Sequence, residues 1–397
     1  MTNSDAAVQP KVSSVGASSG NKDPRAGFVV LGGDLGYLVR FRSDLLKRLS
    51  RNGYRVRVFT PDIDEASVAS LEALGVEHVK IELSRTGTNP LEDARSLFKL
   101  FRKFRDDKPT AVFAYGAKPI AVGIAAAVLA GVPRLYAMLA GLGYAFVEGG
   151  ETSLKRNIVR VMQLGSYRLL LSRCRSVIFH NRDDRNLLVS KGVVASNQTV
   201  VVSGSGIDLV AFPASEAPVA PVRFLFVGRL LRSKGVVELL EAASILQRDC
   251  PEVEVHLAGA SDTNPESVSP AELNAYSGRS NVIFHGQVAD VRPLLASSSV
   301  FVLPSYREGL PRSGLEALAT GRTVVVADVP GCREIVEQGV FGELVPVRDP
   351  VALARSMRRL AQDPERIVRE GRAARLAAEE RFSLTAVTDQ MIEALER

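Results

Sequence analysis

Two glutamates eight positions apart, Glu308 and Glu316, follow an apolar run that predicts a strand. The segment then passes through a Gly/Pro turn and enters a helix at about Ser313, so Glu308 lies in the turn and Glu316 one turn into the helix. The free amides at such a helix start, beside Gly309 and Leu310, suit hydroxyl or phosphate oxygens, and the Glu316 carboxylate suits a ribose diol. The alternative is structural, with Glu308 as a helix cap and Glu316 in solvent.

A second polar group lies in a glycine-led turn, where Gly228 and Arg229 end an apolar run and Lys234 and Gly235 precede a helical pattern. Two cations beside unpaired helix amides suit a diphosphate, although a basic surface loop has the same composition. Both groups lie in the second half of the chain and both follow predicted strands. We therefore expect them to face one cleft.

The pairing of Gly-Arg-x4-Lys-Gly with Glu-x7-Glu resembles the family 4 retaining glycosyltransferases, which are nucleotide-sugar enzymes of the GT-B fold. The resemblance runs from about Gly27 to the C-terminus. It includes Ser205–Asp208 followed by Phe212, similar to the segment that leads into the family's second domain, and Gly331–Glu334, similar to its late Gly-x-x-Glu turn. The implied fold class is α/β, with two Rossmann-like doubly wound domains facing a cleft.

The resemblance implies a role for each matching position. Arg229 and Lys234 match the pair that binds the donor diphosphate and stabilises charge on the departing nucleotide, and Glu308 matches the glutamate near the donor sugar. These three are the predicted catalytic residues. The predicted nucleotide-sugar site adds the ribose ligand Glu316, the amides of Gly309 and Leu310, Gly286 and Val288 beside the base, and Gly33 in the first domain.

Arg229 and Lys234 also bear on whether the enzyme needs a metal ion. Breaking a sugar–phosphate bond places negative charge on the leaving diphosphate, and Arg229 and Lys234 would supply the stabilisation that a metal otherwise gives. We therefore expect no metal and no other cofactor. The run Asp62-Ile-Asp64 matches the Asp-x-Asp pattern of metal-dependent transferases. It follows the second predicted strand, away from the donor residues, so a helix-capping role is favoured.

Many family members carry a histidine in the loop after the fifth strand, and this chain departs from them. It reads Ala137–Phe146 there, and none of its four histidines falls in that loop, so no catalytic histidine is assigned. The Gly-Leu-Gly-Tyr-Ala-Phe spelling and the segments around Lys118 and Asn181 resemble bacterial enzymes that extend undecaprenyl-diphosphate-linked sugars, often with UDP-N-acetylhexosamines. The predicted acceptor residues are Lys118, Tyr144 and Asn181.

Alternating apolar runs and helical patterns are typical of βαβ units. We expect strands at 27–33, 54–60, 79–83, 111–114, 134–138 and 177–179, and then at 223–227, 253–258, 282–285, 300–303 and 323–327. Prolines within 212–221 favour an extended linker. The predicted organisation is a disordered tail over 1–24, an acceptor-binding domain over 25–212, a linker over 213–221, a nucleotide-sugar-binding domain over 222–380, and a helix over 381–397 able to pack back on the first domain.

Composition narrows the class of protein. The 397 residues, 46% hydrophobic and 24% charged, exclude a disordered chain and a small disulfide scaffold. Three cysteines without CxxC spacing indicate neither a disulfide framework nor a zinc site, which favours a cytoplasmic protein. Residues 1–20 lack the apolar stretch of a signal peptide, and the longest uncharged apolar run, Pro119–Pro133, is too short to cross a bilayer.

Charge is uneven, at +10 over residues 1–190 and −4 over 191–397. The basic half predicts an anionic partner. A diphosphate-linked lipid acceptor and the inner membrane leaflet fit better than nucleic acid, because no nucleic-acid-binding module is evident. Two segments could attach the protein peripherally: 95–105, with three phenylalanines at spacing three, and 154–175, with six cations among apolar residues. For each, the alternative is an ordinary helix packed on the core.

Three classes of function remain. The first is a retaining transferase that moves a sugar, an N-acetylhexosamine, from a UDP-sugar to a lipid-linked saccharide in bacterial surface polysaccharide or glycan assembly. The second is a UDP-sugar 2-epimerase of the same two-domain shape, which needs acid–base groups around the sugar. The third is a non-catalytic phosphate-binding protein. A dehydrogenase is disfavoured, because the turn at Gly32–Gly36 lacks the Gly-x-Gly-x-x-Gly spacing.

Overall fold

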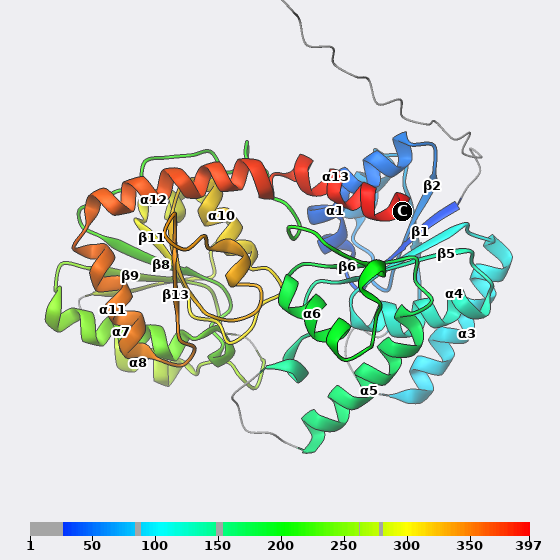
Figure 1. Ribbon diagram of the computed structural model, residues 1–397, viewed down its shortest axis with the longest axis horizontal. Coiled ribbons are helices and arrows are strands. Elements are labelled where there is room, and N and C mark those ends of the chain that lie inside the picture. The colour runs from blue at the N-terminus through cyan, green and yellow to red at the C-terminus, as the bar shows by residue number, and fades with distance from the viewer. Residues whose placement is uncertain (1–26, 84–88, 148–153, 262, 278–280) are drawn as a thin grey trace, which may run out of the picture.

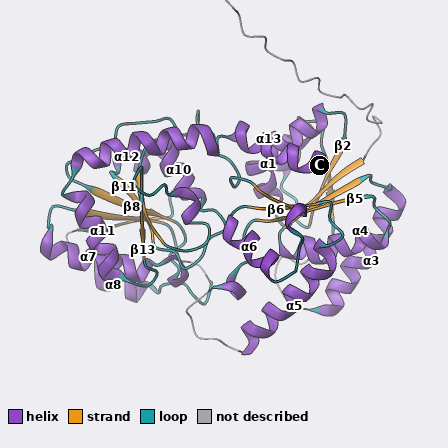
Figure 2. Ribbon diagram, in the orientation of Figure 1, coloured by secondary structure: helices purple, strands orange, loops and turns teal. Residues whose placement is uncertain are grey.

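The computed structural model describes residues 27–83, 89–147, 154–261, 263–277 and 281–397, and the predicted tail over 1–24 lies outside them. Two α/β domains lie side by side, each with a parallel sheet between layers of helices (Figures 1 and 2). The N-terminal domain is on the right in Figure 1 and the C-terminal domain on the left. This architecture confirms the predicted fold class.

The N-terminal sheet has seven parallel strands in the order β3-β2-β1-β4-β5-β6-β7. Their bounds are β1 (Gly27–Leu31), β2 (Arg55–Thr60), β3 (Glu77–Lys80), β4 (Ala111–Tyr115), β5 (Arg134–Leu139), β6 (Ser176–Phe179) and β7 (Thr199–Val201). The first six strands were predicted from the sequence, and β7 was not. This strand has only three residues, and its pairing with β6 at the sheet edge is a tertiary contact.

Helices cover both faces of this sheet, because alternate strand residues are apolar on each side. One face carries α1 (Leu35–Arg51), α2 (Glu65–Glu72) and α13 (Leu384–Glu396). The other carries α3 (Pro90–Asp107), α4 (Ala125–Leu129), α5 (Leu154–Leu171) and α6 (Arg182–Ser190). Short helical turns at Pro119–Ile124, Tyr144–Phe146 and Ser196–Gln198 join these elements.

The last helix of the chain belongs physically to the first domain. In α13, Val387 and Met391 are buried in the same apolar cluster as Leu38 of α1. The Gln390 side chain accepts a hydrogen bond from the Ser203 amide at 3.0 Å. In Figure 1, α13 lies beside α1, so the chain crosses between the domains twice.

The C-terminal sheet has six parallel strands in the order β10-β9-β8-β11-β12-β13 around one apolar core. Its strands are β8 (Arg223–Val227), β9 (Glu254–Ala258), β10 (Val282–Gly286), β11 (Val300–Leu303), β12 (Thr323–Ala327) and β13 (Glu343–Val345). Its helices are α7 (Val236–Asp249), α8 (Pro270–Ser277), α9 (Arg292–Ser297), α10 (Arg312–Thr320), α11 (Pro350–Ala361) and α12 (Pro364–Ala377).

The strand orders position the site. In each sheet the connections run in opposite directions from the central pair, which is β1 and β4 in one domain and β8 and β11 in the other. Ligands of open α/β sheets bind in the crevice outside the carboxyl ends of such a pair. Arg229 follows β8 and Glu308 follows β11, so both lie at the crevice of the C-terminal domain.

Candidate active site

The turn after β8 is held against the segment after β11 by a close backbone approach. Gly235 has φ of +72°, and a Cβ there would lie 2.1 Å from the Pro304 carbonyl oxygen. Only glycine therefore fits at this point. The Tyr306 amide also donates to the Ser233 carbonyl at 2.8 Å. Residues Arg232–Lys234 form a 3₁₀ turn, and α7 begins after Gly235.

This approach brings together two predicted catalytic residues that are 74 positions apart. The Lys234 Nζ atom lies 2.5 Å from Glu308 Oε1, and the Ser305 hydroxyl donates to the same oxygen at 2.7 Å. The Lys234 and Glu308 side chains are 25% and 11% exposed, so water screens their pairing only partly. Ser305 was not singled out by sequence analysis, although it lies within the same motif.

Arg229 has a different environment. Its side chain is exposed and lines a cavity of about 390 Å³ at the carboxyl ends of β8, β9 and β10. Val288 lines the same cavity, and Gly286 ends β10 close by. The structure therefore brings a predicted diphosphate ligand and a predicted base contact to one hollow.

The Glu308 loop lies at the boundary between the domains. A Cβ on Gly309 would lie 1.4 Å from the Ala140 carbonyl oxygen of the N-terminal domain, so the two backbones are in contact. Leu310 follows and packs on Gly204. Gly33, after β1, has open space where a Cβ would lie. A ligand could therefore approach its backbone closely.

The α10 helix presents Glu316. Pro311 is its N-cap residue and no side chain caps it, so the first amides of the helix are available to a ligand. Arg312 Nε lies 3.1 Å from Glu316 Oε1, and the Arg312 guanidinium also donates to the Gly206 carbonyl at 2.5 Å. Burial raises the pKa of the Glu316 carboxyl, and the Arg312 charge opposes that rise.

Two of the three predicted acceptor residues have different partners in the structure. The Lys118 ammonium lies 2.5 Å from the Asp93 carboxylate of α3. Asn181 is fully buried, and its side-chain amide donates to the Gly309 carbonyl at 2.7 Å. Tyr144 lies in a 3₁₀ turn, and its side chain is outside the described part of the structure. Asn181 therefore contacts the Glu308 loop, and Lys118 forms a separate ion pair.

The carboxylates of Asp62 and Asp64 each accept a hydrogen bond from a backbone amide at the start of a helix. Asp64 accepts from the Ser67 amide at 3.0 Å as the N-cap of α2, and the Asp62 carboxylate accepts from the Leu35 amide at 3.1 Å at the start of α1. Among the described residues, no three His, Cys, Asp or Glu side chains gather in a cluster that could hold a metal ion.

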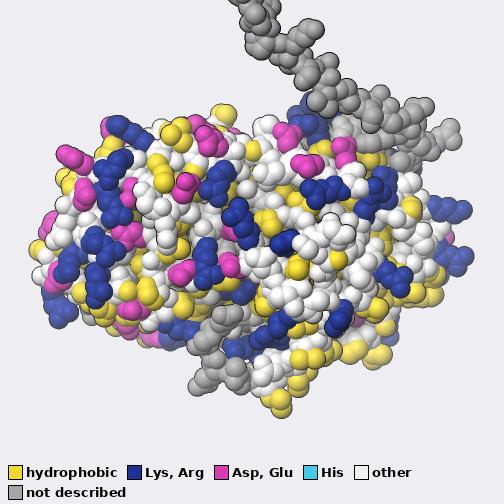
Figure 3. Space-filling view, in the orientation of Figure 1, with side chains coloured by type: hydrophobic (Ala, Val, Ile, Leu, Met, Phe, Trp, Pro, Cys, Tyr) yellow, Lys and Arg dark blue, Asp and Glu magenta, His cyan; other side chains and the backbone are white. Residues whose placement is uncertain are grey.

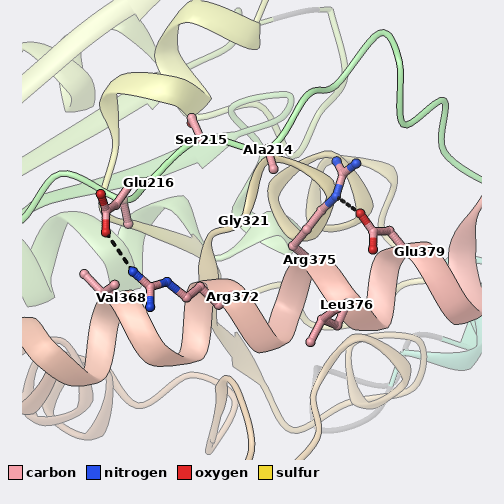
Figure 4. A pocket seen from close by; sticks show the side chains of 11 residues that line it. Ala214, Ser215, Glu216, Gly321, Val368, Arg372, Arg375, Leu376 and Glu379 are labelled. Atoms are coloured by element: carbon pink, nitrogen blue, oxygen red, sulfur yellow. Dashed lines mark hydrogen bonds and ion pairs between the residues drawn. The ribbon is translucent and has the colours of Figure 1, made fainter.

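A cavity of about 490 Å³ lies elsewhere, between the interdomain linker and α12 (Figure 4). Gly321 lines it just before β12, which places it at the amino end of that strand, opposite the site. Its arginines are already paired: Arg372 with Glu216 at 3.1 Å and Arg375 with Glu379 at 2.6 Å. This cavity therefore lies apart from the predicted donor residues, which follow the carboxyl ends of β8 and β11.

The α5 helix exposes an apolar stripe. Leu154, Ile158, Val161, Met162 and Leu169 are between 50% and 77% exposed, and their spacing places them on one face. Hydrophobic side chains gather along the lower edge of the right-hand domain in Figure 3, where Figure 1 shows α5 and α3. No helix in the described part of the chain is both long and apolar enough to span a membrane.

The predicted surface segment over 95–105 lies within α3 and is largely part of the core. Phe104 is 1% exposed and stacks on Phe59, and Phe101 is partly buried against the same cluster. Only Phe98 of the three phenylalanines is well exposed, at 57%. The apolar phenylalanine stripe therefore packs mostly inward, as the structural alternative predicted.

Comparison with known proteins agrees with this geometry. Residues 38–204 match the family described as Glycosyl transferase 4-like domain, and residues 221–363 match Glycosyl transferases group 1. The first match covers β2 to β7, and the second covers all six strands of the C-terminal sheet.

One similar protein is the N,N'-diacetylbacillosaminyl-diphospho-undecaprenol alpha-1,3-N-acetylgalactosaminyltransferase of Campylobacter jejuni. It is 29% identical over 82% of this chain and 87% of its own. The alpha-maltose-1-phosphate synthase of Mycolicibacterium smegmatis is 37% identical over 42% of this chain and 46% of its own. The crystal structure of Anabaena HepE with UDP-glucose has a similar fold, with a TM-score of 0.73 and 20% identity over 93% of this chain and 99% of its own.

Both family matches fall in tandem on one chain, as the two domains require, and the similar proteins are sugar transferases or share the two-domain fold. The chain therefore belongs to the family 4 glycosyltransferases and is a hexosyltransferase with the GT-B fold.

Proposed function

We propose that the enzyme is a retaining transferase that moves an N-acetylhexosamine from a UDP-sugar to an undecaprenyl-diphosphate-linked saccharide, in the assembly of a bacterial surface polysaccharide or glycan. The observation that carries the proposal is the Lys234–Glu308 pair at the domain boundary. The relative from Campylobacter jejuni, whose name specifies an undecaprenol-linked acceptor and an N-acetylgalactosaminyl group, supports the choice of substrates.

In this proposal the C-terminal domain binds the donor. Arg229 and Lys234 hold the diphosphate, Glu316 binds the ribose, and the backbone near Gly286 and Val288 receives the base. Breaking the bond between the anomeric carbon and the diphosphate oxygen leaves negative charge on UDP, which the two cations stabilise. An acceptor hydroxyl oxygen then bonds to the anomeric carbon on the same face of the sugar, and the hydroxyl proton passes to the departing diphosphate oxygen of UDP.

The Lys234–Glu308 contact prepares this step. An ammonium group has three donors on a flexible stem, so Lys234 can bind Glu308 and a phosphate oxygen at the same time. The Ser305 hydroxyl holds the same Glu308 oxygen from the other side. The carboxylate is therefore oriented beside the predicted position of the donor sugar before any substrate arrives.

Protein cations provide the charge stabilisation in this mechanism, so we propose that no metal takes part. Activity should survive an excess of EDTA in the assay. A loss of activity that added Mg²⁺ or Mn²⁺ restores would contradict this part of the proposal.

We also propose that the enzyme works as a peripheral protein at the inner face of the cytoplasmic membrane, with the α5 stripe lying on the leaflet. Exposed apolar residues on one helix face, with arginines such as Arg156 and Arg160 on the same helix, suit an anionic membrane surface. An acceptor held in the bilayer by its lipid would then lie close to the N-terminal domain.

The test is to incubate the full chain with UDP-sugars, with and without a synthetic undecaprenyl-diphosphate-linked saccharide. The proposal expects UDP release and a longer glycolipid, with an α-linked product from an α-linked donor by NMR. Conversion of the UDP-sugar to its 2-epimer without acceptor would indicate the epimerase. UDP binding without any product would indicate a binding protein. Either result would overturn the proposal.

A further inference from the structure

The start of α6 holds the loop that carries Glu308, although it belongs to the other domain. Asn181 is the N-cap residue of α6, and its side-chain oxygen accepts from the Asp184 amide at 2.7 Å. The Asn181 and Asp184 side chains are both completely buried. The two side chains also contact each other, through Asn181 Nδ2 and Asp184 Oδ2 at 3.1 Å.

Both chain neighbours of Glu308 are bound there. The Arg307 guanidinium pairs with the Asp184 carboxylate, with side-chain exposures of 6% and 0%, and it also donates to the Phe146 carbonyl at 2.9 Å. On the other side, the Asn181 amide donates to the Gly309 carbonyl at 2.7 Å. The residue before Glu308 is therefore tied to the N-terminal domain through its side chain, and the residue after it through its backbone carbonyl.

Burying this ion pair costs free energy, because both charges lose their contact with water. Burial raises the pKa of the Asp184 carboxyl, and the Arg307 charge is the main opposing effect. A buried pair of this kind gives little net stability compared with apolar residues of similar size, but removing one partner leaves a buried charge without compensation. The pair is therefore better explained by the geometry that it imposes on the loop.

The Glu308 side chain is held differently. Lys234 and Ser305, which bind its carboxylate, both belong to the C-terminal domain. The direction of the carboxylate thus depends on the C-terminal domain. The path of its backbone depends on both domains, because the Glu308 amide also donates to the Pro330 carbonyl of the C-terminal domain at 3.1 Å. Arg307 and Gly309 keep their contacts with the N-terminal domain only while the domains keep the arrangement seen here.

We propose that Asp184 and Asn181 are positioning residues for sugar transfer, which set the place of Glu308 by holding Arg307 and Gly309. The inference rests on the proposed function, because it takes Glu308 to act beside the donor sugar. Neither residue needs to touch a substrate for this role. Misplacing a reacting group by about 1 Å can lower a rate by about 100-fold.

The chain offers a matched control in the next residue. Asp183 also pairs with an arginine of the other domain, Arg333, at 3.0 Å, but these two side chains are 35% and 42% exposed. Exposed pairs contribute little because water and salt screen them. Asp183→Asn should therefore change kcat by less than about twofold, whereas Asp184→Asn should lower kcat by about 10- to 100-fold.

A second variant, Asn181→Ser, tests the same role if Asp184→Asn does not fold. Asn181→Ser keeps a good N-cap oxygen for α6 and removes the amide that binds Gly309. We expect its kcat to fall by about 10-fold, with the KM for the UDP-sugar and the Kd for UDP within about threefold of the parent. A purely structural role would instead lower thermal stability and leave the kcat of the folded enzyme unchanged.

The outcomes separate the two proposals. If the parent enzyme transfers no sugar, the proposed function fails. If the parent is active and Asn181→Ser is folded, binds UDP and keeps the parent kcat, the positioning role is wrong and the proposed function stands. Should Asp184→Asn fail to fold, the kcat of Asn181→Ser decides alone.

Discussion

The carboxyl edge of the C-terminal sheet and the α5 surface of the N-terminal domain differ in how their side chains are held. At the sheet edge, Lys234, Glu308 and Glu316 each have a named partner within hydrogen-bonding distance. On α5 the exposed apolar side chains share one helix face. A site for one charged ligand depends on individual atoms, whereas a surface for a leaflet depends on summed area. Single substitutions should therefore have large effects at the first and graded effects at the second.

Lys234→Ala should have the largest effect. It removes a cation that stabilises the leaving diphosphate, so kcat/KM for the UDP-sugar should fall by about 100- to 1,000-fold. The exposed Lys191 at the end of α6 is a matched control, and Lys191→Ala should keep the parent value. Steady-state UDP release measures both. If the Lys234→Ala enzyme kept the activity of the parent, the proposal that this sheet edge binds the donor would be wrong.

Gly309→Ala should have the next largest effect. The new Cβ would lie 1.4 Å from the Ala140 oxygen, so the domains must separate at this point. We expect kcat to fall by at least about 10-fold. The Kd for UDP should stay within about threefold, because Arg229 and Val288 line a cavity inside one domain. Calorimetry with UDP and a transfer assay test this together. Equal losses in kcat and UDP affinity would show that the donor site spans the boundary.

A double change on α5, Ile158→Asp with Met162→Asp, should weaken binding to vesicles containing phosphatidylglycerol by about 10-fold. Both side chains are exposed, at 50% and 68%, so the fold should tolerate the change. Transfer to a long-chain lipid acceptor should fall, while transfer to a short soluble analogue stays at the parent rate. Val351→Asp, at a 54% exposed position on α11, should leave vesicle binding unchanged. Vesicle co-sedimentation gives the affinities.

Phe98→Ala should have the smallest effect. Its ring is 57% exposed, so the free energy of unfolding should change by no more than about 0.5 kcal/mol. If the leaflet reaches α3 as well as α5, vesicle affinity should fall by about threefold. No change in vesicle affinity would limit the proposed membrane surface to α5. Thermal unfolding and co-sedimentation are the two measurements.

Most strands could be predicted from the sequence, and so could the positions of Arg229 after β8 and Glu308 after β11, because these segments leave strong local signals. The runs after β8 and β11 combine apolar strands, glycines and charged residues within a few positions, and two such runs in one domain must share a sheet edge. The short edge strands β7 and β13 left no such signal. Arg307 stood inside the most informative segment, yet its partner Asp184 is 123 positions away and nothing local links the two.

The same reasoning explains the outcome for the phenylalanines of α3. A spacing of three indicates one helix face but not what covers it. The sheet residue Phe59 packs against Phe104 and makes that face part of the core. For α5, tertiary packing left the apolar stripe exposed.

The sequence by itself determined the family and the two-domain α/β architecture and predicted which residues form the donor edge, because strands and glycine-led turns follow from local pattern. Only the tertiary structure decided that Lys234 meets Glu308, that α13 returns to the first domain, and that Asn181 and Asp184 hold the loop around Glu308. These contacts join residues far apart in the chain. Their geometry depends on how two separately formed sheets pack against each other, which no local pattern specifies.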